Sequence, residues 1–299
     1  MSPIMMLNVV AFYRFVHLGD LEALRATLLE FCRGEGLRGT ILIASEGING
    51  TVAGPANGIQ ALLARLEAIC GISKGEVKHS GADAWPFMRM KVRIRPEIIT
   101  MRAPEADPSV KAGTYVKPAE WNALIGDAEV LLVDTRNRYE TKVGTFEGAV
   151  DPGIDSFTEF KAYVETKLDP AKHRKVAMFC TGGIRCEKAS SYMLSQGFEE
   201  VFHLKGGILK YLEEVEPEHS RWNGECYVFD DRVAIGHGLE AGSWTACYAC
   251  GEPLSKEEAR SDAYEPGVSC PHCIETLTEE RARDLRARHK QNLAAKALD

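Results

Sequence analysis

The alternation of hydrophobic and polar positions changes twice along the chain, and the first change comes near residue 100. Before it, the pattern alternates between the periods of strands and helices, with Asp20 and Pro55 marking helix starts. Two β-branched runs around a Glu-Gly-Ile-Asn-Gly turn predict a hairpin between the two helices. The order of strand and helix patterns predicts a ferredoxin-like α+β domain over residues 1–100. The predicted elements are, in chain order, residues 8–15, 21–33, 39–54 (the hairpin), 55–69, 76–80 and 88–95.

Residues 94–113 contain three prolines and few residues expected in a core, so the sequence predicts a linker there. Beyond it, short apolar strands within 129–136, 175–183 and 201–207 alternate with helices within 157–168 and 187–198. This alternation predicts an α/β domain over residues 118–218, with a parallel sheet covered by helices on both faces. The pattern then dissolves into an extended stretch over 222–235. Residues 219–299 form a small Cys-rich segment that ends in a charged helix over 274–298.

Composition and charge narrow the possible functions. The chain has 299 residues, 45% of them hydrophobic, and no apolar run of the length that crosses a bilayer. A net charge of −7 argues against a protein that coats nucleic acid through bulk charge, although residues 1–100 carry a small basic excess. The first residues lack a basic leader, which predicts a cytoplasmic protein without membrane association. Its nine cysteines are therefore expected to be thiols, metal ligands or catalytic groups.

One cysteine stands at the end of a predicted parallel strand, directly before a helix. The loop there is Cys180, Thr181, Gly182, Gly183, Ile184 and Arg185. Ligands bind at this edge of parallel sheets, and a helix N-terminus together with a nearby cation stabilises a thiolate. A Cys-x5-Arg loop is the size that holds a phosphate, so this shorter loop favours sulfur or a small group. The pattern therefore predicts a nucleophilic thiolate on Cys180, with a buried strand-end cysteine as the structural alternative.

The Cys-x4-Arg loop resembles that of rhodanese domains, and so do VDTRNRYE, the Gly148–Gly153 turn and VFHLKGGI around it. Together with SEGINGT near the start and GVSCPHC near the end, these motifs resemble the bacterial rhodanese-domain tRNA uridine hydroxylases. The resemblance spans nearly the whole chain. It implies an oxidoreductase that converts the wobble uridine of tRNA to 5-hydroxyuridine with molecular oxygen as co-substrate, using Cys180 as the catalytic residue.

The residues alone leave the reaction open. Motif and spacing favour a sulfurtransferase that carries a persulfide on Cys180, whereas a thiolate can also add to carbon 6 of uracil and activate carbon 5. A third hypothesis is a non-catalytic RNA-binding protein with a vestigial rhodanese module, but the intact Cys180 and Arg185 argue against it. No Gly-x-Gly-x-x-Gly fingerprint and no histidine triad indicates how oxygen is activated or which electron donor serves. No protein partner is evident.

Several residues beside the loop have two interpretations. Cys186 is either a resolving thiol or a small residue packed in the first helical turn. Asp134, Arg136 and Glu140 are expected to be structural, with Arg136 paired to Glu140. The SEGINGT hairpin is either a tight turn or a segment close to the RNA.

Four C-terminal cysteines form two Cys-x2-Cys pairs, with 19 residues between the pairs. This spacing is typical of zinc ribbons, in which four thiolates close a tetrahedral shell, so we expect a structural zinc ion. A redox pair, free thiols and an iron–sulfur centre are the alternatives. The ligands would be Cys247, Cys250, Cys270 and Cys273.

Residues 87–95 alternate without a break between apolar and basic side chains. Met88, Met90, Val92 and Ile94 are expected on one face of the strand. The opposite face would present four cations to an RNA backbone, or else be a solvated sheet surface. These cations are Arg89, Lys91, Arg93 and Arg95.

Overall fold

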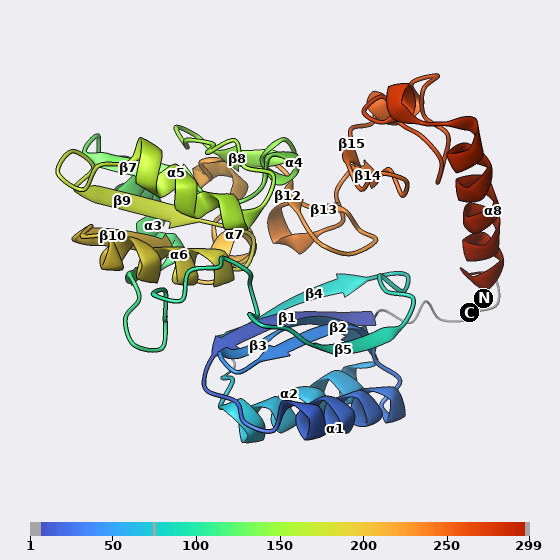
Figure 1. The fold of residues 1–299 in the computed structure, drawn as a ribbon, viewed down its shortest axis with the longest axis horizontal. Helices are drawn as coiled ribbons and strands as arrows, with labels where there is room; N and C mark the ends of the chain where they lie inside the picture. The colour runs from blue at the N-terminus through green and yellow to red at the C-terminus, as the bar shows by residue number, and fades with distance from the viewer. Residues whose placement is uncertain (1–6, 74–75, 297–299) are drawn as a thin grey trace.

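The computed structural model describes residues 7–73 and 76–296, which form an α+β N-terminal domain, an α/β domain, a linker between them and a Cys-rich C-terminal segment (Figure 1). The sheet of the N-terminal domain has the strand order β4-β1-β3-β2-β5. Its first four strands have the ferredoxin-like order, and β5 adds an edge strand parallel to β2. The elements are β1 (Leu7–Phe15), α1 (Leu21–Gly34), β2 (Arg38–Ala44), β3 (Gly47–Gly54), α2 (Ala56–Cys70), β4 (Val77–Ala82) and β5 (Met90–Ile94).

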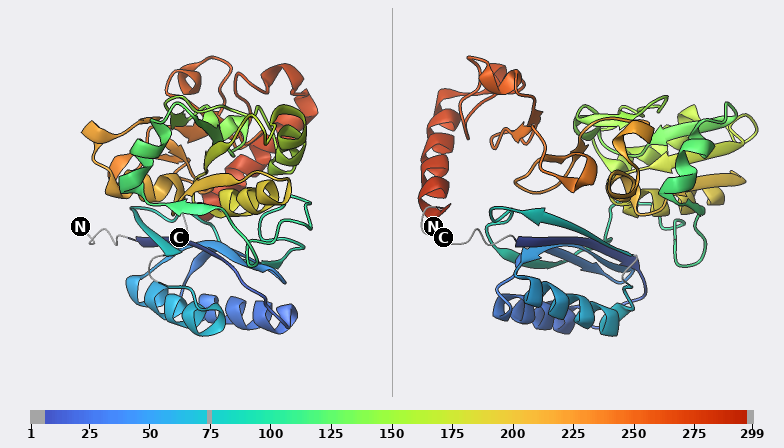
Figure 2. Two further views of the ribbon diagram at one scale, coloured as in Figure 1. Left: turned by 90° about the vertical axis from the view of Figure 1, so that its left-hand side faces the viewer. Right: turned by 180° about the vertical axis from the view of Figure 1, so that it is seen from behind.

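Both helices of this domain cover the same face of the sheet (Figure 1). Leu28 of α1 and Leu62 of α2 are fully buried against Ile41 and Val52 of the sheet. The opposite face carries no helix of its own domain and is turned toward the second domain (Figures 1 and 2). The predicted hairpin is present as β2 and β3, but its turn is limited to residues 45–46, since β3 already begins at Gly47.

The second domain has a parallel sheet with the order β6-β10-β9-β7. Two hydrophobic clusters flank it, one with α5 and α6 and the other with α3 and α7, so helices cover both faces as predicted. The elements are β6 (Thr114–Val116), α3 (Pro118–Ile125), β7 (Val130–Asp134), α4 (Arg138–Thr141), β8 (Gly144–Phe146), α5 (Phe160–Lys167), β9 (Lys175–Phe179), α6 (Ile184–Ser195), β10 (Glu200–Leu204) and α7 (Gly207–Glu214).

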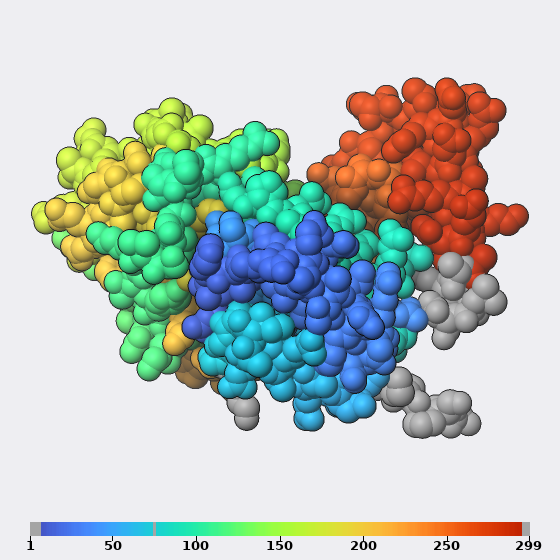
Figure 3. All heavy atoms as spheres, turned by 60° about the horizontal axis from the view of Figure 1, so that its bottom comes forward, coloured from blue at the N-terminus to red at the C-terminus, as the bar shows by residue number. Residues whose placement is uncertain are grey.

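The linker corrects one expectation. Residues 94–113 were predicted to contribute little to a core, but Met101, Ala103 and Ala106 are buried in the cluster beneath α5 and α6. Lys188 of α6 donates hydrogen bonds to the carboxylates of Glu46 and Glu97, and it is 2% exposed. Figure 3 shows the turquoise-to-green stretch around residue 100 lying against the blue N-terminal domain. The linker is thus packed, and it holds the two domains together.

The C-terminal segment contains short strand pairs and one long helix. Its elements are β11 (Trp222–Gly224), β12 (Cys226–Tyr227), β13 (Ala234–Ile235), β14 (Thr245–Ala246), β15 (Pro253–Leu254) and α8 (Glu279–Lys296). The predicted helix over 274–298 therefore starts later, and residues 297–298 lie outside the described part of the chain. Across residues 7–73 and 76–296, none of the helices is apolar and long enough to span a membrane.

Candidate active site

The loop from Cys180 to Gly183 joins the carboxyl end of β9 to the start of α6. Gly183 has φ 100°, a conformation that side chains rarely adopt, and this turn directs its N–H to the Cys180 sulfur at 3.1 Å. Gly207, the first residue of α7, allows that helix to approach the loop closely. A Cβ there would lie 2.6 Å from the Cys180 carbonyl oxygen, which accepts a hydrogen bond from the Ile208 N–H. The glycines therefore allow backbone groups to surround the cysteine.

The environment of Cys180 favours its thiolate. Burial opposes ionisation, but hydrogen bonds from Cys186, the charge of Arg185 and the Gly183 N–H outweigh it and lower the pKa of Cys180 to about 6. At pH 7 a thiol with that pKa is about 90% ionised. The pKa of Cys186 moves the other way, raised mainly by burial and by the adjacent Cys180 thiolate. Cys186 is fully buried and contacts the Thr135 hydroxyl at 3.3 Å.

Arg185 forms a bidentate ion pair with Glu140 of α4. Its Nη1 and Nη2 donate to the two carboxylate oxygens at 2.7 and 2.8 Å, and both side chains are buried. The pairing fixes the guanidinium beside the loop, because a bidentate contact restrains both position and plane. The sequence pointed to Glu140 only as a structural partner of another arginine.

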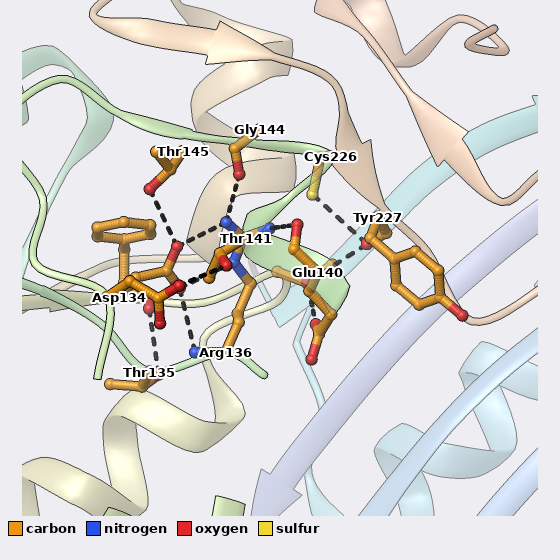
Figure 4. Close-up of polar contacts among 12 residues, drawn as sticks. Asp134, Thr135, Arg136, Glu140, Thr141, Gly144, Thr145, Cys226 and Tyr227 are labelled. Carbon is orange, nitrogen blue, oxygen red and sulfur yellow. Dashed lines mark hydrogen bonds and ion pairs between the residues drawn. The ribbon is translucent and has the colours of Figure 1, made fainter. Parts of the chain in front are cut away.

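The prediction that Arg136 pairs with Glu140 is wrong, because Arg136 pairs with Asp134. The guanidinium of Arg136 donates instead to both carboxylate oxygens of Asp134, at 2.9 and 2.6 Å, and to the Gly144 carbonyl oxygen (Figure 4). Its remaining contact with Glu140 is to the backbone oxygen, at 3.3 Å. Both members of the Asp134–Arg136 pair are fully buried, and neither lines the cavity beside Cys180.

A cavity of about 500 Å³ lies between the open face of the N-terminal sheet and the Cys180 loop. Cys180, Thr181, Gly182 and Arg185 line one side of it. The other sides come from β1, β3 and β4 and from the segment after β12, through residues such as Tyr13, Asn49, Lys78 and Phe229. Its volume is in the range of small-ligand pockets. The linker also lines it, through residues 97–100, so both domains, the linker and the C-terminal segment all contribute to the site.

Sequence reasoning missed Tyr13 and Lys78. The Tyr13 hydroxyl donates to Glu187 at 2.8 Å, and a Cβ on Gly183 would lie 2.9 Å from the same hydroxyl, so Tyr13 sits on the loop. Lys78 is 6% exposed although it belongs to a strand of the sheet. The strand alternation in the sequence places both residues on the sheet face opposite the helices. Only the docking of the second domain makes that face a wall of the cavity.

The cations of the predicted basic strand lie in or next to the cavity wall. Lys91 and Arg93 pair in register with Thr40 and Leu42, which line the cavity, and Arg95 lines it directly. Within the described residues, none of the four predicted cations forms an ion pair with a carboxylate. Met88 is half exposed and precedes β5, so its predicted place on the apolar face is wrong; Arg89 also precedes the strand.

The four C-terminal cysteines lie together, far along the chain from Cys180. Their sulfur atoms are all within 4.8 Å of one another, and three of the pairs are 3.7–3.9 Å apart. Four thiolates at about 2.3 Å from a tetrahedral zinc ion stand about 3.8 Å apart, so the cluster fits a metal ion of that kind. The hydrophobic cluster around them has three fully buried members, Cys247, Leu254 and Cys270.

Two family models match this chain, one for each domain. Residues 7–98 match the UPF0176 acylphosphatase like domain, and residues 117–214 match the Rhodanese-like domain. Among solved structures, a rhodanese-related protein from Thermoplasma volcanium is 23% identical over 35% of this chain and 95% of its own, with a TM-score of 0.27. An acylphosphatase from Coxiella burnetii is 15% identical over 31% of this chain and 100% of its own, with a TM-score of 0.25.

A curated relative covers almost the whole chain. The tRNA uridine(34) hydroxylase of Mesorhizobium japonicum is 54% identical over 99% of this chain and 96% of its own length. That similarity includes the acylphosphatase-like domain, the rhodanese domain and the Cys-rich segment alike. The resemblance read from the motifs is confirmed, and the chain belongs to the tRNA uridine(34) hydroxylase family.

Proposed function

We propose that this chain is an oxidoreductase that hydroxylates the wobble uridine of tRNA, uridine 34, to 5-hydroxyuridine, with molecular oxygen as co-substrate. The observation that carries the proposal is the 54% identity over 99% of the chain to a protein named for that reaction. A cavity with a reactive thiol on one wall and cations at its rim supports it.

In this proposal the Cys180 thiolate is the catalytic nucleophile. It adds to carbon 6 of the uracil ring, and the displaced π electrons make carbon 5 electron-rich, which prepares that carbon for oxygen. One oxygen atom enters the product and the other leaves as water, for which a donor supplies two electrons and two protons. Arg185 keeps the thiolate charged, and Glu140 holds Arg185 in place. The loop from Thr181 to Ile184 supplies the backbone around the sulfur.

The tRNA would approach along β5. Its basic side chains lie on the cavity side of the sheet, so a phosphate backbone bound there would bring a base to the cavity mouth. Enzymes that modify a base turn it out of the stack into a pocket, and an anticodon loop presents its bases at low cost. We assign this contact to Arg89, Lys91, Arg93 and Arg95, in the acylphosphatase-like domain.

A zinc ion on Cys247, Cys250, Cys270 and Cys273 would be structural. Four sulfur ligands leave no open position, so the ion would supply folding energy and no catalytic water. The ion pair of Lys142 with Glu258, at 2.7 Å, then ties the zinc segment to the rhodanese domain. Reduced thiols and metal-bound thiolates at these positions suit a cytoplasmic protein.

A sulfurtransferase activity is the second candidate, because a Cys-x4-Arg loop with inward N–H groups also suits a persulfide. One experiment separates the two. Cells that lack the protein are complemented with the wild type, Cys180→Ser or Cys186→Ser, and their tRNA nucleosides are measured by mass spectrometry. Loss of 5-hydroxyuridine derivatives supports hydroxylation, whereas loss of thiolated nucleosides supports sulfur transfer.

We expect Cys180→Ser to abolish the modification, because a hydroxyl does not ionise at this site. Cys186→Ser should have a smaller effect, since it leaves the nucleophile intact and the serine hydroxyl can still donate a hydrogen bond to the thiolate. Normal modification by Cys180→Ser would refute the thiolate mechanism in either reaction. A Cys186→Ser defect as large as that of Cys180→Ser would instead favour a resolving thiol.

A further inference from the structure

Lys78 is a buried cation that the mechanism above does not use. It lies on β4, is 6% exposed and lines the same cavity as Cys180. Its ammonium donates to the backbone oxygen of Glu76 at 3.3 Å and lies 4.7 Å from the centre of the Tyr13 ring. Among the described residues, no carboxylate forms an ion pair with it. A lysine buried without such a partner is costly, which points to a partner that the substrate supplies.

The charges around Lys78 keep it protonated but ready to release its proton. Burial, with a smaller contribution from the charge of Lys210, lowers the pKa of Lys78 to about 8. The negative charges of Cys180, Glu187 and Glu76 favour the ammonium form and limit this decrease. At pH 7 most molecules therefore carry the ammonium. A group whose pKa lies this close to the operating pH is suited to general acid catalysis.

Addition of a thiolate to uracil creates a need for an acid in this cavity. The sulfur lone pair forms the bond to carbon 6, the C5–C6 π pair becomes the C4–C5 double bond, and the C4–O4 π pair moves to O4. The resulting negative oxygen requires a proton or a strong hydrogen bond, and the cavity wall next to Lys78 offers apolar side chains, Val9 and Ala11.

We propose that Lys78 is a catalytic residue that donates a hydrogen bond, and then a proton, to O4 of the target uracil as Cys180 adds to carbon 6. The proposal rests on the proposed function, because it takes uridine as the substrate. The proton passes from Nζ to O4 and leaves a neutral amine. The amine recovers the proton when the C4 carbonyl re-forms and the thiolate leaves. Tyr13, whose ring contacts Lys78 and whose hydroxyl lies against the loop at Gly183, links the acid to the loop that carries the thiol.

The test isolates the addition step from the oxygen chemistry. The probe is a tRNA anticodon stem–loop with 5-fluorouridine at position 34, because fluorine makes carbon 6 more electrophilic and the adduct can form without oxygen. Full-length protein is mixed with saturating probe, and the covalent complex is measured on denaturing gels and by mass. The wild type should form it, and Cys180→Ser should not. Lys78→Gln should slow its formation at least ~10-fold. The control Lys111→Gln, at an exposed linker position, should leave the rate unchanged.

Two further measurements show how Lys78 acts. Probe affinity should change less than ~3-fold in Lys78→Gln, and the alkylation midpoint of Cys180 should rise too little to account for the slower adduct. Lys78→Arg should bind normally yet form the adduct slowly, because a guanidinium is a poor proton donor. If Lys78→Gln does not fold by circular dichroism, Lys78→Met, which leaves no buried polar group, replaces it.

Each other outcome has a definite meaning. A wild type that forms no adduct, with normal probe binding, counts against thiolate addition and hence against the proposed function itself. A wild-type adduct that Lys78→Gln forms at an equal rate overturns the role of Lys78 alone. If Lys78→Gln binds the probe more weakly but forms the adduct at the normal rate when saturated, Lys78 contacts a phosphate instead. If its alkylation midpoint at Cys180 rises enough to explain the whole defect, Lys78 only supports the thiolate electrostatically. Either result overturns the proposal.

Discussion

Replacing Arg185 with Met should raise the pKa of Cys180 and leave much of the thiol protonated at neutral pH. In the wild type a pKa of about 6 gives about 90% thiolate at pH 7. An unperturbed thiol, with a pKa of about 8.5, gives about 3%. The charge of Arg185 is one of the main causes that lower this pKa, and its removal also leaves the Glu140 carboxylate unpaired in the same buried region.

Both consequences of Arg185→Met destabilise the thiolate. One pKa unit corresponds to about 1.4 kcal/mol, and a unit charge close to a buried group contributes more than that. We therefore expect the pKa to rise by at least about one unit, so that thiolate at pH 7 falls to about half or less. Stability should also fall by about 3–5 kcal/mol, because the variant leaves a buried charge without its partner.

Alkylation by iodoacetamide between about pH 4.5 and 9.5, read on the Cys180 peptide by mass spectrometry, gives the midpoint directly. Arg185→Lys should give an intermediate midpoint, because lysine keeps the charge but loses the bidentate contact. The double variant Glu140→Gln/Arg185→Met removes both charges and should recover part of the stability while its midpoint stays high. A folded Arg185→Met protein with a midpoint within about 0.3 units of the wild type would refute the reasoning. So would a double variant with a wild-type midpoint, since the unpaired carboxylate would then be the whole cause.

Four other predictions follow from the same structure. Purified protein should contain about one zinc ion per chain, which metal analysis measures; Cys250→Ser should lose it and destabilise the C-terminal segment, whereas Cys32→Ala, in the N-terminal core, should keep it. Changing Arg89, Lys91, Arg93 and Arg95 together to Gln should weaken tRNA binding and flatten its salt dependence; unchanged binding at matched salt would show a merely solvated face. Lys188→Met should cost at most about 3 kcal/mol in urea unfolding, because Glu46 and Glu97 lose their partner but keep 25% and 21% exposure, whereas Lys172→Met, at 79% exposure, should change little. Folding lowers the pKa of Cys180, so the stability that its thiolate contributes is complete above about pH 8.5 and is lost as the pH falls through about 6. Cys180→Ala should therefore destabilise the protein more at about pH 8.5 than at about pH 6. An equal loss of stability at both pH values would contradict the shifted pKa.

The sequence by itself determined the features that depend on neighbouring residues. Strand and helix periods gave both domains, because burial on one face repeats every two or 3.6 residues. The strand–glycine–helix junction at Cys180 was also readable, since its chemistry comes from a few consecutive residues and a helix terminus. The four cysteines of the C-terminal segment have a spacing that itself indicates metal binding, and the structure brings their sulfur atoms together.

Only the tertiary structure decided what surrounds the thiol. Arg185 pairs with Glu140 and Arg136 with Asp134, a choice that depends on the path of the chain between β7 and β8 rather than on spacing. The linker contributes Met101 to a core because it packs against another element, which its prolines did not indicate. The open face of the N-terminal sheet became a wall of the cavity through docking of the two domains, and Lys78 thereby lines the same cavity as Cys180, about a hundred residues away in the sequence. Such contacts are non-local, so no short stretch of the sequence specifies them.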